Sequence, residues 1–132
     1  MWSVVTGAYA VLLLAVSVIP VKADVKIPHL DKVVHLCEYL VFAWLLVQAV
    51  RASSALARGE GGANRMPERE YLWWVWIYAT SYGLLIEVIQ AMLPWRSAEL
   101  LDAAANALGA ALGVLIGQKS LRRGNHKLMA VR

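Results

Sequence analysis

The sequence predicts an all-α protein that crosses a membrane as a bundle of four transmembrane helices. Of its 132 residues, 60% are hydrophobic and only 17% are charged, so there are too few polar side chains to cover a soluble core. Four apolar stretches are each close to the roughly 20 residues that a helix needs to cross the hydrocarbon layer. The length suits one membrane domain comprising residues 1–132, without a separate soluble module.

Proline residues and polar segments bound the four predicted helices. The first stretch stops at Pro20 and the third at Pro94, because proline lacks the amide hydrogen that a continuing helix needs. An alternative is that the first stretch is a cleaved signal peptide, but no Lys or Arg precedes its apolar run, as such peptides require. The predicted spans are residues 2–19, 30–50, 71–93 and 100–118.

The Lys and Arg residues are distributed unevenly between the two sides of the predicted membrane. Nine of the 13 lie on the side that holds the N-terminus, the second loop and the C-terminal tail, and four lie on the other side. Because basic residues favour the cytoplasmic side, both termini are predicted to be cytoplasmic. The second loop, residues 52–70, contains three glycines and Pro67 and is predicted to be a flexible linker, whereas residues 119–132 form a basic tail.

The basic balance, a net charge of +4, does not indicate nucleic-acid binding. The basic residues lie between apolar runs and at the C-terminus rather than in a patch on a soluble surface. Membrane lipids, including anionic headgroups near the tail, are the partners that this distribution predicts. The single cysteine, Cys37, excludes an intrachain disulfide.

Several polar and ionisable residues lie within the predicted spans, where a charged side chain is costly and usually faces the bundle interior. At 100° per residue, those near the start of the second span share one face of their helix. With a rise of about 1.5 Å per residue, His35, Glu87 and Asn106 all lie in the outer half of the bilayer. One polar layer between three helices is therefore predicted. Its candidate ligand-binding residues are Asp31, Lys32, His35, Glu38, Tyr39, Glu87, Gln90, Arg96, Asp102 and Asn106.

This layer has two interpretations. In the first, the polar groups only neutralise one another and hold the helices together, at an average gain of about 0.6 kcal/mol for each interhelical hydrogen bond. In the second, they form a binding or catalytic site. The carboxylates outnumber the cations, and a network that only held the helices together could be built from fewer charged groups. A carboxylate at this depth needs a partner, so Arg96 is expected to fold back over Glu87 or Asp102.

Small residues recur at every fourth position on the last predicted helix, at Gly109, Gly113 and Gly117. Such a stripe lets another helix approach closely, so these glycines are predicted to be helix-packing residues rather than part of a site. Replacing one of them with a larger residue is expected to force two helices apart.

Taken in order, the polar and glycine residues of the last three spans resemble the VanZ-like family of small bacterial membrane proteins. The match consists of four pieces that keep their order and spacing. The pieces are Asp31-Lys32-x-x-His35-x-x-Glu38-Tyr39, Tyr82-Gly83-Leu84-Leu85-Ile86-Glu87-Val88-Ile89-Gln90, Pro94-x-Arg96 and Asp102-x-x-x-Asn106-x-x-Gly109-x-x-x-Gly113. One departure is Trp95, since a small residue is more usual between that proline and arginine.

The resemblance implies a four-helix, multi-pass protein of the bacterial cytoplasmic (inner) membrane with a role in the cell envelope. It also implies a link to antibiotic resistance, since a founding member is associated with tolerance of the lipid-tailed glycopeptide teicoplanin. No reaction is securely attached to the family. The resemblance therefore indicates architecture better than mechanism.

Three classes of function stay open. The favoured class is a non-enzymatic protein that binds or modulates an envelope lipid, a lipid-linked precursor or a lipoglycopeptide, with Lys32 and Arg96 facing its phosphate or carboxylate. A transporter or ion pathway is another class. Four helices without inverted repeats disfavour it unless the protein forms an oligomer.

The remaining class is a membrane-embedded enzyme that acts on a lipid-linked substrate. Its catalytic candidates are His35 as general acid or base, with Asp31 or Asp102 to orient it and Glu87 as a second carboxylate. No cofactor and no metal are predicted. A metal alternative would use His35, Glu87 and Asp102, and one histidine among oxygen ligands suits Mg²⁺ or Mn²⁺ better than structural Zn²⁺.

Overall fold

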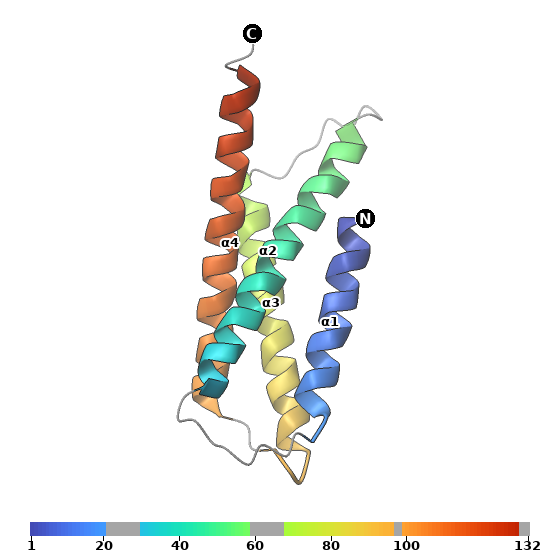
Figure 1. Cartoon of the computed structure of the whole chain (residues 1–132), viewed down its shortest axis with the longest axis vertical. Coiled ribbons are helices and arrows are strands. Elements are labelled where there is room, and N and C mark those ends of the chain that lie inside the picture. Colours follow the sequence, from blue (N-terminus) through green and yellow to red (C-terminus); the bar gives the residue numbers. More distant parts are fainter. Residues whose placement is uncertain (21–29, 59–67, 97–98, 130–132) are drawn as a thin grey trace.

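The structure is a computed structural model in which every described element is a helix. It describes residues 1–20, 30–58, 68–96 and 99–129. The helices are α1 (Trp2–Val18), α2 (Leu30–Arg58), α3 (Glu68–Ala91) and α4 (Leu100–Met129). They run alternately up and down, so α1 begins and α4 ends toward the same end of the bundle (Figure 1). The all-α prediction is confirmed.

Two of the helices are longer than the apolar pattern predicts. α2 continues beyond the predicted end at residue 50 to Arg58, and α4 continues beyond residue 118 to Met129. The apolar pattern marks where a membrane-crossing segment ends, whereas a helix continues for as long as its residues favour it. Residues 51–58 are rich in Ala, Leu and Arg, which are strong helix formers, so α2 extends past the apolar segment.

The predicted linker over residues 52–70 is wrong at both ends for the same reason. α2 occupies its beginning, and α3 already starts at Glu68. The centre of the linker, residues 59–67, lies outside the described residues, so its flexibility stays a prediction. Most of the predicted tail, residues 119–132, likewise belongs to α4.

Three of the described helices contain a segment that is long and apolar enough to cross a membrane, namely Leu30–Ser54, Arg69–Ala91 and Leu100–Ser120. α1 is also apolar but has 17 residues, about 26 Å at 1.5 Å per residue and slightly less than the hydrocarbon core. Large apolar side chains are exposed on every helix, among them Val11, Val41, Leu84 and Leu112. An apolar surface of this extent suits contact with lipid rather than with water.

The closest packing in the bundle is between α2 and α4, along the glycine stripe. Cβ atoms built on Gly109 and Gly113 would meet the backbone carbonyls of Leu36 and Leu40 in α2. Gly117 faces a valine side chain of α2 instead. These contacts are the close approach that a small residue at every fourth position predicts.

α1 is held against α3 by hydrogen bonds from side chains to its backbone carbonyls. The hydroxyl of Tyr82 donates to the carbonyl of Ala10 at 2.7 Å, and Nε2 of Gln90 donates to the carbonyl of Ser17 at 3.2 Å. Polar bonds of this kind stabilise helix association where no water competes for the donors. They therefore set the depth of α1 relative to α3.

Candidate functional site

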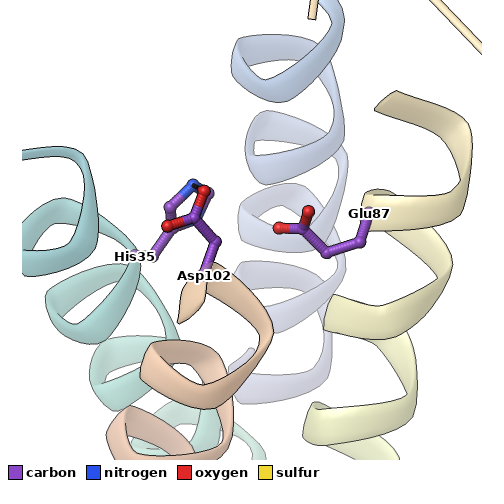
Figure 2. Close-up of side chains that lie close together, drawn as sticks. All are labelled: His35, Glu87 and Asp102. Carbon is purple, nitrogen blue, oxygen red and sulfur yellow. Dashed lines mark ion pairs between the residues drawn. The ribbon is translucent and has the colours of Figure 1, made fainter. Parts of the chain in front are cut away.

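Three ionisable side chains from three helices meet at the end of the bundle where α2 and α4 begin and α3 ends. His35 comes from α2, Glu87 from α3 and Asp102 from α4. One potential ligand atom of each lies within 4.8 Å of those of the other two. The carboxylate of Glu87 points from α3 toward the other two side chains (Figure 2). The structure thus brings together the three residues that the sequence predicts as catalytic candidates.

His35 lies between two carboxylates. Its Nδ1 is 3.8 Å from Oε2 of Glu38, and its Nε2 is 3.9 Å from Oδ2 of Asp102. Both distances are longer than a hydrogen bond, so these contacts are ion pairs only when the imidazole is protonated. Each ring nitrogen of His35 therefore faces a carboxylate oxygen at slightly more than hydrogen-bond distance.

Several buried polar atoms of this layer have no hydrogen-bond partner among the described residues. Glu87, Asp102 and Asn106 are only 6%, 7% and 1% exposed. The unpartnered atoms are both carboxylate oxygens of Glu87, both amide atoms of Asn106, Nδ1 of His35 and the hydroxyl of Tyr39. Each such atom costs about 1–3 kcal/mol when it stays unpaired. A network that only held helices together would pair these atoms, so their number favours a polar ligand.

Lys32 is the cation that the layer itself contributes. Its Nζ is 3.1 Å from Oδ2 of Asp31, 2.8 Å from Oε2 of Glu99 and 3.4 Å from Oδ1 of Asp102. Asp31 and Lys32 stand at the start of α2, whereas Glu99 and Asp102 stand at the start of α4. Lys32 therefore bridges the two helix starts, and its single charge is shared among three carboxylates.

Glu99 belongs to this cluster, although the sequence pattern does not single it out. Its backbone carbonyl accepts hydrogen bonds from the amides of Asp102 and Ala103 at 3.0 and 3.3 Å, so it opens the first turn of α4. An acidic residue is common at a helix start because of the helix dipole, so its presence there does not indicate a site. The sequence feature that identifies Glu99 as a member of the cluster is its position three residues before Asp102, on the same face of the helix.

The expected contact of Arg96 with Glu87 or Asp102 is wrong. Nη2 of Arg96 donates instead to the backbone carbonyl of Val16 in α1 at 3.5 Å, and the indole of Trp95 donates to the same helix end. The carbonyls in the last turn of a helix lack partners within the helix and attract such donors. The turn between α3 and α4 thus directs Arg96 to α1, and Lys32 rather than Arg96 forms the ion pair with Asp102.

Other predicted site residues have different surroundings. Gln90 is buried, and its amide nitrogen donates a hydrogen bond to the backbone carbonyl of Ser17 in α1. That nitrogen is therefore not free to bind a ligand in the polar layer. Tyr39 and Asn106 lie beside Gly83 of α3, where an added Cβ would be 3.0 Å from the ring of Tyr39 and 3.1 Å from Nδ2 of Asn106. The missing side chain at Gly83 therefore leaves room for both polar groups.

The layer carries more negative than positive groups. Among the described residues, its carboxylates are Asp31, Glu38, Glu87, Glu99 and Asp102, whereas the basic side chains near them are Lys32, the titratable His35 and Arg96, which is within electrostatic reach of Glu38. Because Lys32 is already engaged and Arg96 faces α1, the predicted recognition of an anion by these two residues has no support in the geometry. The arrangement is suited to binding a cation or a positively charged group.

Comparison with known proteins assigns the chain to a family. The family model described as VanZ/LLP1 matches residues 4–120, a range that includes every residue of the polar layer. The chain therefore belongs to the VanZ/LLP1 family, in agreement with the resemblance to VanZ-like proteins. No curated protein and no solved structure matches it.

Proposed function

We propose that this member of the VanZ/LLP1 family is a multi-pass protein of the bacterial cytoplasmic membrane that binds the headgroup of an envelope lipid, or of a lipid-tailed amphiphile such as a lipoglycopeptide. The ligand occupies the polar layer between α2, α3 and α4, and its tail lies along the apolar outer surface of the bundle. Binding rather than chemistry is the principal role of the site.

The observation that carries this proposal is the set of buried polar atoms without partners. They project from three helices into one layer toward the end of the bundle where α2 and α4 begin. A polar ligand would supply the missing hydrogen bonds, and an amphiphile can reach the layer from the bilayer without crossing water. The negative charge of the layer requires that the ligand carry positive charge, or bind together with a cation.

Lipid retention tests the proposal. The protein is extracted into nanodiscs with a bacterial polar lipid extract, and native mass spectrometry measures the lipid that stays bound to each chain. We expect one retained lipid for the wild-type chain and at least a tenfold loss of occupancy for Glu87→Gln and Asp102→Asn. Both variants should keep the wild-type melting temperature, because an amide nearly matches the shape of a carboxylate.

The matched control for Glu87→Gln is Glu70→Gln, because Glu70 is an exposed carboxylate near the start of the same helix. It should retain the lipid. If folded yield and lipid occupancy decline in parallel for Glu87→Gln and Asp102→Asn, the layer only holds the helices together. If occupancy is unchanged in both folded variants, the lipid is bound elsewhere.

An enzyme is the second candidate, and the position of His35 between Glu38 and Asp102 favours it. An imidazole flanked by carboxylates can take up and release a proton during a reaction. The same mass spectra distinguish this candidate from simple binding. A lipid whose mass changes during incubation with the wild-type chain, but not with His35→Gln, would establish catalysis.

We expect both termini to be cytoplasmic and the polar layer to lie toward the outer face. α1 begins and α4 ends toward the same end of the bundle, away from the layer (Figure 1). In a background without Cys37, a membrane-impermeant maleimide should label Ala23→Cys and Ser97→Cys in intact cells. Ser53→Cys and Asn125→Cys should react only after permeabilisation. Labelling of Ala23→Cys and Asn125→Cys from one side would contradict a chain of four spans.

A further inference from the structure

The polar layer contains two groups of three side chains whose donor atoms lie close enough together for a metal ion. They are His35, Glu87 and Asp102, and Asp31, Glu99 and Asp102. The second group already surrounds a cation, because the ammonium group of Lys32 lies 2.8–3.4 Å from all three of its carboxylates. In the first group Lys32 contacts only Asp102, and no Lys or Arg among the described residues forms an ion pair with Glu87.

We infer that His35, Glu87 and Asp102 bind one divalent cation of the manganese or magnesium type. Their donor atoms are within 4.8 Å of one another. An ion with bonds of about 2.1 Å holds two donors no more than about 4.2 Å apart, so small side-chain rotations close the site. Because each residue comes from a different helix, the ion ties α2, α3 and α4 together.

Glu87 supplies the independent observation that points to an ion. Its side chain is 6% exposed, and both carboxylate oxygens have no hydrogen-bond partner among the described residues. The carboxylate is directed toward His35 and Asp102 rather than toward lipid (Figure 2). A buried ionised carboxylate without a partner is costly, and a divalent ion would balance Glu87 and share Asp102 with Lys32, while a neutral imidazole adds no charge.

The surroundings of His35 fit a metal ligand. Its Nε2 faces Asp102, and its Nδ1 is 3.8 Å from Oε2 of Glu38 on the opposite side of the ring. Histidines that bind metals usually donate from their second nitrogen to a carboxylate, which orients the ring and selects the nitrogen that binds. Glu38 becomes a positioning residue for the ion once a small rotation brings its carboxylate within hydrogen-bond distance of Nδ1, and Nε2 of His35 is the ligand atom.

The donor set selects the class of ion. One imidazole nitrogen and two carboxylates, without a thiolate, suit manganese(II) and, more weakly, magnesium(II). Three protein ligands leave positions open around a six-coordinate ion, where water or a phosphate oxygen of a headgroup would bind. The inference does not rest on the proposed lipid function, because an ion can be bound without any lipid.

Manganese binding by the purified protein tests the inference. The chain is stripped with a chelator in detergent, and manganese(II) is added while electron paramagnetic resonance measures the free ion. We expect one saturable site per chain, which Glu87→Gln and Asp102→Asn abolish. Glu38→Gln should weaken binding about tenfold to a hundredfold, as is typical for the loss of a carboxylate that supports a ligand. Glu70→Gln is the control and should bind as the wild-type chain does.

A second measurement detects a histidine ligand in the wild-type chain itself. Electron spin echo modulation of the bound manganese should reveal a histidine nitrogen in the wild-type chain, identified by labelling histidine with nitrogen-15. The coupling should persist in His126→Gln and disappear in His35→Gln. The absence of saturable binding or of this coupling in the wild-type chain would overturn the inference. So would binding that depends on Asp31 and Glu99 but not on Glu87. Retained lipid without manganese binding would overturn the ion site alone and leave the proposed function standing.

Discussion

Gly109→Ala is expected to lower the stability of the bundle more than alanine at Gly7, Gly83 or Gly117. A Cβ at this position would meet the backbone carbonyl of Leu36, which cannot rotate away as a side chain can. The added methyl group therefore has to push α2 and α4 apart along their closest contact, at a cost of about 1–3 kcal/mol or more. The melting temperature and folded yield in detergent should both decline clearly.

The other glycines provide graded comparisons. Gly113→Ala should resemble Gly109→Ala, because its neighbour is the backbone carbonyl of Leu40. Gly117→Ala should be milder, because the side chain of Val47 can move. Gly7→Ala is the control, since no heavy atom lies within 4 Å of its added Cβ. If Gly109→Ala melted at the same temperature as Gly7→Ala, α2 and α4 would not pack in the way the structure describes.

Lys32→Met is expected to separate the beginnings of α2 and α4 and to reduce the folded yield strongly. Methionine keeps much of the length of lysine but removes the charge that Asp31, Glu99 and Asp102 share. The three carboxylates then repel one another, and Asp102 is too buried for water to screen it well. Melting in detergent at neutral pH measures the effect.

Two further variants separate charge from packing. Lys32→Arg should retain most of the stability, because a guanidinium can contact several carboxylates at once. Arg96→Met should have a small effect, because the long bond from Arg96 to Val16 lies at an exposed helix end. If Lys32→Met and Arg96→Met reduced the melting temperature equally, the charge cluster around Lys32 would not account for the loss.

Much of the architecture and part of the site follow from the sequence alone. Apolar length determined the number and order of the helices, because an apolar stretch of about 20 residues crosses a bilayer as a helix that satisfies its own backbone hydrogen bonds. Helical periodicity and rise per residue determined the face and the depth of His35, Glu87 and Asp102, and the structure brings these three together. These properties are local, since each depends on one helix and on the direction in which it crosses the membrane.

Only the tertiary structure decided which charges meet. Arg96 and Lys32 are both long and basic and stand at the same end of the bundle, yet Arg96 reaches the end of α1 while Lys32 meets Asp31, Glu99 and Asp102. The choice depends on the shape of one short turn and on the rotation of α2 against α4. Periodicity within a single helix carries no information about either. The partners of a long side chain are set by the backbone positions of its neighbours, and those exist only once the helices have packed.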